Sequence, residues 1–300
     1  MSKIAKLNHL FGITNQLKFE VDANGLVMVN IDNEFAEASL CLQGAHLLSW
    51  IPKMQKPVIW LSDNAIFSKN KSIRGGVPIC WPWFGAHQTE KKYPAHGFAR
   101  TQEWKPVESL VMPDGRTCFT LQLFPNEITQ QFWKYEFELR LQVIVGKKLE
   151  MILITKNMSD QVFSIGQAFH TYFNVSNINQ VSVQGLENVT FIDALEDWKR
   201  KSESDPITIN AEIDRIYLDA GDDCIIKDLE FMRSIRISKT GSKSTVVWNP
   251  WIEKSIRMGD MGEDGYKNMV CVETTNATED VVSIAPGEEH QMSVCYQLES

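Results

Sequence analysis

The sequence predicts an all-β fold, a single large antiparallel β-sandwich formed by residues 1–300. Three observations predict it. Apolar and polar residues alternate in most strand-like segments, such segments recur every 10 to 20 residues, and Gly, Pro, Asn or Asp stand between them. Because no linker rich in Pro, Gly or Ser and no shift in composition divides the chain, we expect both sheets to contribute to one core in one domain.

The clearest pair of strands lies near the middle of the chain. Residues Tyr135–Val143 place aromatic or aliphatic side chains on one face and polar side chains on the other, which is typical of a half-buried strand. A turn follows at Gly146-Lys147-Lys148, and the alternation resumes over Leu149–Thr155. The two segments therefore predict a β-hairpin.

The remaining segments predict further strands and no long helix. The best helical candidate, Glu187–Ser204, contains the β-prone run Val189–Ile192, so we expect a strand followed by a loop there. No segment carries a long apolar stripe with a period of 3.6 residues. The other predicted strands are Leu26–Ile31, Leu40–Trp50, Val58–Leu61, Thr117–Phe124, Phe163–Val175, Val181–Val183, Ile207–Ile209, Ile235–Ile237, Thr245–Trp248, Met269–Thr274 and Gln291–Leu298.

Composition and charge exclude several classes of protein. Apolar residues make up 43% of the 300 residues and charged residues 23%, which is ordinary for a globular chain with a substantial core. The net charge of −8 argues against a nucleic acid as the main partner. We see no signal peptide and no apolar run of membrane-spanning length, so we expect a cytoplasmic protein without a membrane partner.

Cysteine and histidine spacing predicts neither disulfides nor a metal site. The six cysteines form no CxxC pair, and four of them lie in strand-like runs, where a free cysteine behaves as a small hydrophobe. The six histidines include no HxH or HExxH pattern. Nucleotide-binding glycine motifs and GxSxG are also missing from the sequence, so we expect no metal and no cofactor.

The densest unusual segment runs from Ser72 to Trp104. It combines Arg74, a Gly-Gly pair, two prolines, several large aromatic residues, His96 and Arg100. Prolines disfavour a central strand here, so we expect a rigid loop that carries two cations, a common setting for a binding site. Aromatic faces suit the apolar face of a sugar, and guanidinium groups suit a carboxylate or phosphate. The alternative is that Trp81, Trp83 and Phe84 only cover the core.

Three further segments carry candidate functional side chains. His170 lies in an aromatic-flanked strand, where a histidine is more often a satisfied core residue than a catalytic one. Asp214 adjoins Arg215, and the common alternative for such neighbours is a surface ion pair. Glu273 follows a short apolar run at a predicted strand end, where burial would raise the pKa of its carboxyl and suit it to act as a base.

Taken together, these segments resemble the aldose 1-epimerase (galactose mutarotase-like) superfamily, and more closely its branch of glucose-6-phosphate 1-epimerases. The ordered set spans about residues 40 to 275, so the resemblance covers most of the chain. It implies a supersandwich of antiparallel strands. The residues that carry the resemblance are Gly44–Trp50, Ile73–Pro78, Phe84-Gly85, His96–Arg100, Phe169–Phe173, Asp214–Tyr217, Val247–Pro250 and Val270–Glu273.

The resemblance also implies roles and a reaction. His170 would be the general acid and Glu273 the general base that interconvert the α and β anomers of a hexose 6-phosphate, with no cofactor. Arg74 and Arg100 would bind the phosphate. The sugar would be contacted by His96 and Asp214.

The sequence differs from the pattern of this family at one position: the residue before His96 is often glutamine in relatives and is Ala95 here. We expect a monomer whose partner is a small sugar phosphate. Two alternatives stay open: an aldose 1-epimerase of unphosphorylated hexoses, and a non-catalytic carbohydrate-binding protein on the same fold. A third alternative is a structural sandwich whose aromatic residues are all core.

Overall fold

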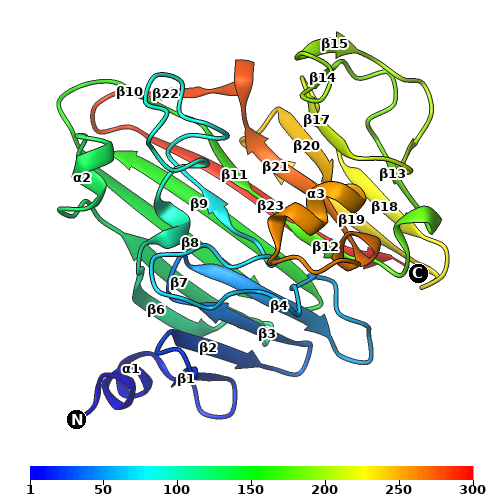
Figure 1. Ribbon diagram of the computed structural model, residues 1–300. Helices are drawn as coiled ribbons and strands as arrows, with labels where there is room; N and C mark the ends of the chain where they lie inside the picture. The colour runs from blue at the N-terminus through cyan, green and yellow to red at the C-terminus, as the bar shows by residue number, and fades with distance from the viewer. Residues whose placement is uncertain (300) are drawn as a thin grey trace.

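Antiparallel sheets dominate the computed structural model, which describes residues 1–299, and the predicted all-β sandwich is confirmed (Figure 1). The largest sheet is nine-stranded. In spatial order it contains β16 (Ile207–Thr208), β13 (Val181–Gln184), β18 (Cys224–Asp228), β19 (Arg233–Thr240), β23 (Glu289–Glu299), β9 (Lys148–Asn157), β8 (Phe137–Val145), β7 (Thr117–Leu123) and β6 (Lys105–Val111).

A second, eight-stranded sheet packs against the first. Its spatial order is β15 (Lys199–Lys201), β14 (Phe191–Asp193), β17 (Ile213–Tyr217), β20 (Ser244–Asn249), β21 (Met269–Asn276), β11 (Gln167–Phe169) and β5 (Ile79–Cys80), and β12 (Tyr172–Asn174) also pairs with β21. Two smaller sheets complete the fold. They contain β1 (Leu17–Val21), β2 (Val27–Asp32), β3 (Ala36–Cys41) and β4 (His46–Pro52), and β10 (Phe163–Ile165) with β22 (Val282–Ile284).

The helices are short. Figure 1 shows α1 beside β1 at the N-terminal side and α3 close to β20 and β21. No helix among residues 1–299 has the length and apolar character needed to cross a membrane. The helical segments are α1 (Lys3–Phe11), α2 (Thr129–Phe132) and α3 (Trp251–Met258), and the 3₁₀ turns η1 (Ala99–Thr101), η2 (Ile178–Gln180), η3 (Gly265–Asn268) and η4 (Thr278–Asp280).

The eight-stranded sheet has two apolar faces with different neighbours. Successive side chains of a strand point to opposite faces, so Val247 and Val272 lie on one face and Trp248 on the other. Val247 and Val272 join the large core shared with the nine-stranded sheet. Trp248 joins a second cluster with Tyr172 and Cys271. This second face forms the floor of the site described below.

Several predicted strands are confirmed with small shifts of their ends. The predicted hairpin is β8–β9, in which Val145 pairs with Leu149 across the turn. The strand predicted over Leu40–Trp50 is wrong as a single element: it is β3 and β4, separated by a turn because Gly44 and Ala45 adopt φ values of 79° and 45°. Phe163–Val175 likewise forms three short strands, and Val58–Leu61 forms isolated bridges only.

The expectation of no helical stripe missed α1 and α3. Both helices are short, and α3 begins directly after Pro250 and ends at Gly259, where φ is 71°. The segment Glu187–Ser204 forms β14, then a loop as predicted, and then the additional short strand β15. Strands β1, β6, β17 and β18 were not predicted. Apolar and polar residues do alternate in β1, whereas adjacent residues of like polarity interrupt the alternation in the other three.

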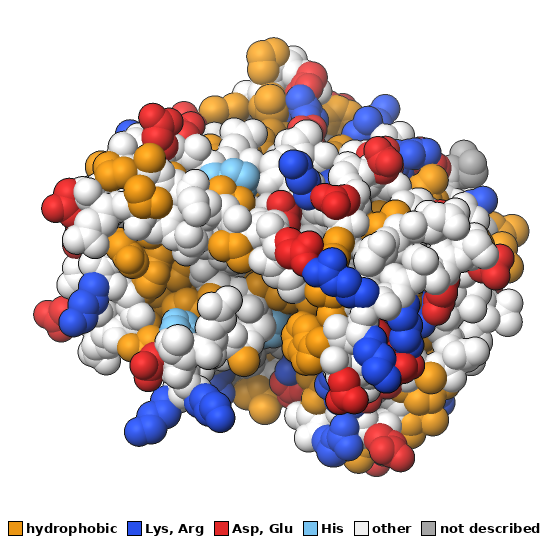
Figure 2. Space-filling model, turned by 90° about the horizontal axis from the view of Figure 1, so that it is seen from above, with side chains coloured by type: hydrophobic (Ala, Val, Ile, Leu, Met, Phe, Trp, Pro, Cys, Tyr) orange, Lys and Arg blue, Asp and Glu red, His pale blue; other side chains and the backbone are white. Residues whose placement is uncertain are grey.

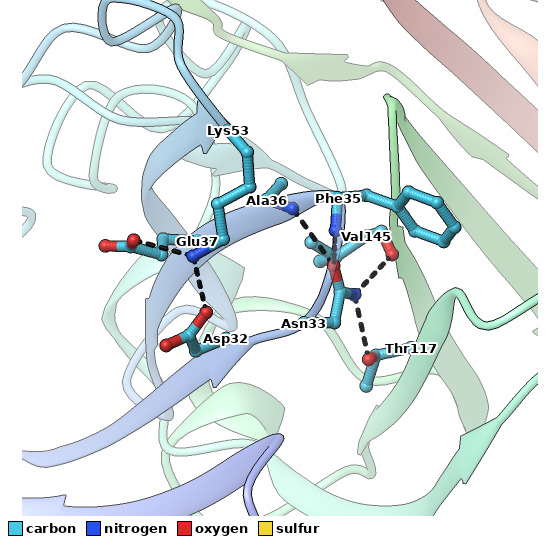
Figure 3. A network of polar contacts seen from close by, with 8 residues as sticks. All are labelled: Asp32, Asn33, Phe35, Ala36, Glu37, Lys53, Thr117 and Val145. Atoms are coloured by element: carbon cyan, nitrogen blue, oxygen red, sulfur yellow. Dashed lines mark hydrogen bonds and ion pairs between the residues drawn. The ribbon is translucent and has the colours of Figure 1, made fainter.

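A buried asparagine joins the four-stranded sheet to the nine-stranded sheet (Figure 3). The side-chain amide of Asn33 donates to Thr117 Oγ1 and to the carbonyl of Val145, both at 3.0 Å. Its side-chain oxygen accepts from the backbone N–H groups of Phe35 and Ala36 at 2.9 and 3.0 Å. Because Asn33 is 5% exposed, water cannot replace these partners.

Replacing Asn33 with alanine is expected to lower the free energy of unfolding by about 2–4 kcal/mol, because buried donors and acceptors lose their partners. Urea unfolding monitored by tryptophan fluorescence measures this change. Lys53→Ala is the control, since the same region holds Lys53 only by exposed ion pairs with Asp32 and Glu37 at 2.7 and 2.8 Å. Equal losses in the two variants would contradict the prediction.

Candidate active site

A cavity of about 410 Å³ opens on the outer face of the eight-stranded sheet. Figure 2 looks down on the molecule from above and shows pale-blue histidine side chains around a hollow on this face. All six side chains predicted from the sequence to form a site line this cavity, although four separate segments supply them. They are Arg74, His96, Arg100, His170, Asp214 and Glu273.

Strand register brings His170 and Glu273 together. Phe169 pairs with Thr274 and Tyr172 pairs with Cys271, so the unbroken register places His170 opposite Glu273. The ladder is interrupted at His170, whose N–H donates instead to the carbonyl of Pro78 at 3.0 Å. The sequence placed Glu273 at a strand end, which is wrong: it lies inside β21.

The two side chains form a nearly dry pair at the cavity floor. His170 Nδ1 lies 3.3 Å from Glu273 Oε1, and the side chains are 12% and 2% exposed. Burial lowers the pKa of His170 well below its usual range, and the nearby His96, Arg100 and Arg74 lower it further. Burial raises the pKa of Glu273 well above its usual range. Both groups therefore favour their neutral forms, and the pair holds one proton that either partner can carry.

Aromatic side chains surround the imidazole ring of His170. Its ring stacks on Tyr172 with centroids 5.0 Å apart and planes within 6°, and Trp248 meets it edge-on at 6.0 Å. The predicted core-histidine alternative is therefore half right, since His170 is nearly buried but faces a cavity. Its Nδ1 has no hydrogen-bond partner among the described residues, and neither has Glu273 Oε2.

Backbone contacts hold the Arg74 loop against this floor. The N–H of Tyr172 donates to the carbonyl of Gly76 at 3.0 Å, and Gly76 donates to Trp60 at 2.7 Å. Gly76 has a φ of 68°, and a Cβ there would lie 2.4 Å from the carbonyl oxygen of Leu47. Only glycine fits this close approach, and the loop consequently carries Arg74 to the cavity.

Arg74 is held by internal partners. Its Nε donates to Asp260 Oδ1 at 3.0 Å and its Nη1 donates to the Tyr172 hydroxyl at 2.9 Å. Burial lowers the pKa of Arg74, but the Tyr172 and Asp260 side chains outweigh burial and raise it overall. The guanidinium therefore stays charged and is fixed in one orientation, with Nη2 free of these contacts.

Arg100 contrasts with Arg74. Its Nη2 donates to the carbonyl of Ala95 at 2.8 Å, and no carboxylate among residues 1–299 forms an ion pair with it. At this position the contact with Arg100 is therefore made by the backbone of Ala95. Arg100 is the cation of this cavity whose charge has no described counter-ion.

His96 presents a defined tautomer to the cavity. It has a φ of 64°, and its Nδ1 accepts from the N–H of Gly85 at 3.3 Å. Burial lowers the pKa of His96 to about 3, with Arg100 and Arg74 adding to the effect. The ring is therefore neutral, so its Nε2–H is a hydrogen-bond donor.

The side chains of Asp214 and Arg215 lie on opposite faces of β17. Arg215 forms an ion pair with Glu203 at 2.8 Å and not with its neighbour in the sequence, while Asp214 lines the cavity. Burial raises the pKa of Asp214, and Lys254 partly offsets this. Lys254 Nζ lies 3.8 Å from Asp214 and 2.8 Å from Glu212.

Sequence reasoning missed three residues of the site. Lys254 lies on α3, Asp260 follows that helix, and Trp198 lies in the β14–β15 loop at the cavity with a φ of 59° and 62% exposure. No motif marks them in the sequence.

The alternative that the aromatic residues near Arg74 only cover the core holds for one of them and fails for another. Trp81 is fully buried in the core as the alternative expected, whereas Phe84 lines the cavity.

One group of side chains among residues 1–299 could approach a metal ion. The ligand atoms of His170, Cys271 and Glu273 lie within 4.8 Å of one another. Burial raises the pKa of Cys271 well above its usual range, so its sulfur keeps its proton and is a poor ligand. The geometry suits a proton-transfer pair better than a metal centre.

The chain matches a known protein family over most of its length. The aldose 1-epimerase family model matches residues 27–297. The chain belongs to the aldose 1-epimerase family. The resemblance predicted from the sequence motifs is thereby confirmed.

Individual members of the aldose 1-epimerase family are similar over most of the chain. A protein of Escherichia coli (strain K12) named "Putative glucose-6-phosphate 1-epimerase" is 42% identical over 255 residues, which are 85% of this chain and 84% of that protein. A protein of Cenchrus ciliaris with the same name is 38% identical over 261 residues, 84% and 78% of the two chains. The crystal structure of a "putative mutarotase" from Salmonella typhimurium superposes with a TM-score of 0.90, 34% identity and full coverage of both chains.

Replacing Glu273 with glutamine is expected to stabilise the protein at neutral pH. The folded-state pKa of Glu273 lies above the ordinary value of 4.5, so ionisation favours the unfolded chain as pH rises past that value. Glutamine does not ionise, and the gain should reach on the order of 1–2 kcal/mol at pH 7. Urea unfolding at pH 4 to 8 measures it.

The gain should vanish near pH 4, where both states of the wild type are protonated. Glu203→Gln, on an exposed carboxylate paired with Arg215, is the control and should show no such pH-dependent gain. A Glu273→Gln variant that is less stable than the wild type at pH 7 would refute the prediction.

Proposed function

We propose that this protein interconverts the α and β anomers of a hexose 6-phosphate, with glucose 6-phosphate as the preferred substrate. The observation that carries the proposal is the buried pair of His170 and Glu273, 3.3 Å apart, on the floor of a cavity that also contains the unpaired Arg100. The names of the relatives at 38–42% identity support the same substrate class.

The pair suits a reaction that needs two proton transfers at one carbon. Glu273 as carboxylate takes the proton of the C1 hydroxyl, while His170 as imidazolium gives a proton to the ring oxygen. The C1–O5 bond breaks with its electrons going to O5, and C1 becomes an aldehyde. Glu273 is then protonated and His170 neutral. Rotation about C1–C2 and the reverse transfers close the ring as the other anomer.

The proton count of the pair stays constant throughout this cycle. Before ring opening the proton is on His170, and afterwards it is on Glu273, so no proton has to be exchanged with solvent. The opposed pKa shifts of the two groups favour one proton on the pair over a wide range of pH, with that proton on Glu273 at rest. It therefore moves from Glu273 to His170 across their 3.3 Å contact before ring opening. A dry floor also strengthens the field that each group exerts on the substrate.

The arginines of the cavity would bind the phosphate group of the substrate. A protein of net charge −8 repels a dianion at long range, so a local concentration of positive charge is needed to bind one. Arg100 offers an uncompensated guanidinium, and Arg74 offers its remaining Nη2 donor in a fixed orientation. His96 and Asp214 would contact the sugar hydroxyls. An aldose 1-epimerase of free hexoses would have no use for Arg100 in this position.

We also infer that the chain works as one domain and as a monomer in the cytoplasm. The large core draws residues from both major sheets, which supports a single domain. All six cysteines are free, which suits a reducing compartment.

Exchange NMR between the anomers of glucose 6-phosphate, with and without the protein, tests the proposal. We expect faster exchange for the phosphorylated sugar than for glucose or galactose measured in parallel. In His170→Ala the enzyme-dependent rate should fall about 10²–10⁴-fold, because one proton transfer loses its catalyst. Preferential acceleration of galactose would move the assignment to an epimerase of free hexoses, and no acceleration of any sugar would leave a binding protein.

Replacing Arg100 with glutamine is expected to raise KM for glucose 6-phosphate at least about tenfold and to change KM for glucose much less, because charge-assisted contacts to the phosphate are lost. Arg74→Gln should act in the same direction. Arg215→Gln is the matched control, since this arginine pairs with Glu203 on the opposite face of β17. Equal effects of Arg100→Gln on both sugars would rule out a phosphate contact.

A further inference from the structure

A continuous set of contacts joins Arg74 to the proton-transfer pair. Asp260 fixes Nε of Arg74 at 3.0 Å, and Nη1 of Arg74 contacts the Tyr172 hydroxyl at 2.9 Å. The Tyr172 ring lies parallel to the imidazole of His170 at 5.0 Å, and His170 contacts Glu273 at 3.3 Å. An anion bound by Arg74 would therefore be one aromatic ring away from the general acid.

The charges around His170 oppose its protonated form. Arg74 and Arg100 are cations in the same cavity, and His96 is a neutral ring whose centroid lies 5.7 Å from that of His170. Tyr172 and Cys271 are neutral neighbours, because burial raises the pKa of both. Glu273 is the acidic partner in direct contact, and Asp214 lies farther along the same face on β17.

A bound dianion would reverse this balance. It would offset the positive potential that Arg74 and Arg100 exert on His170, and the imidazolium needed to protonate the ring oxygen would become easier to form. Because the side chains of His170 and Glu273 are only 12% and 2% exposed, such an effect is larger here than in solution. The phosphate would then act on the chemical step as well as on binding.

We propose that an oxyanion held by Arg74 and Arg100 activates the His170–Glu273 pair, so that the protein also accelerates anomer exchange of a sugar without any phosphate when a separate small dianion occupies the phosphate position. The inference rests on the proposed function and extends it from binding to activation. It assigns the site a further activity: two-part catalysis on an aldose together with a free oxyanion.

The geometry allows the two parts to bind separately. The cavity of about 410 Å³ has room for a pyranose ring and an oxyanion together. Arg100 has no described counter-ion to displace, and Arg74 is already oriented by Asp260 and Tyr172 without the substrate. Because the cations are pre-positioned, a covalent link to the sugar is not needed to organise them.

The experiment uses two separate molecules in place of glucose 6-phosphate. D-xylose supplies the sugar ring without C6 and the phosphate, and phosphite supplies the dianion. Exchange NMR gives the anomer exchange rate with the full-length protein at increasing phosphite, at constant ionic strength set with chloride. The rate without protein is subtracted, because phosphite itself catalyses the reaction as a general base. We expect the protein-dependent rate to rise saturably, by about tenfold or more.

Variants locate the effect. In Arg100→Gln the ratio of the rates with and without phosphite should fall close to one, whereas Arg215→Gln should keep the wild-type ratio. Glucose 6-phosphate is measured on every sample. Accelerated glucose 6-phosphate with no phosphite effect on xylose would overturn the activation and leave the phosphate as a binding group only.

Two other results would also overturn the inference. Phosphite activation that survives in Arg100→Gln would place the anion elsewhere, and inhibition of the xylose reaction by phosphite would show that the two parts compete. No acceleration of glucose 6-phosphate itself would instead reject the proposed function, and the activation with it.

Discussion

Burial of two titratable groups against each other is the constraint on which the rest of this structure depends. His170 and Glu273 lose water on the floor of a cavity, and each is driven toward its neutral form. Burial of such groups costs free energy that a stable core must offset. The large apolar cluster between the two main sheets supplies that stability directly beneath the site.

Because successive side chains of a strand point to opposite faces, one sheet can pack the core on one face and form the site on the other. Along β21, Val270 and Val272 enter the large core, while Cys271 lies in the second apolar cluster on the opposite face and Glu273 lines the cavity. Shifting the register of this strand by one residue would exchange the two sets. The chemistry and the packing are therefore fixed by the same hydrogen-bond ladder, and neither can drift without the other.

The fold class could be predicted because period-two alternation is a local signal, and ordered motifs singled out six residues that the structure places around one cavity. The proximity of His170 to Glu273 is not local: it follows from the register of β21 against β11 and β12. Lys254 and Asp260 could not be predicted for a related reason. They belong to α3 and the turn after it, and α3 is a short helix whose apolar stripe is too brief to stand out.

The position of β23 has a consequence for how the chain folds. This strand, Glu289–Glu299, pairs with β19 on one side and β9 on the other and follows both of them in the chain, so the middle of the nine-stranded sheet is synthesised after the strands on either side of it. Until β23 leaves the ribosome, β19 and β9 each have one edge without its partner strand, and that edge is exposed to solvent. Co-translational folding can thus build the two halves of this sheet separately, but they join only after release of β23, and a nascent chain stalled earlier would be a target for chaperones.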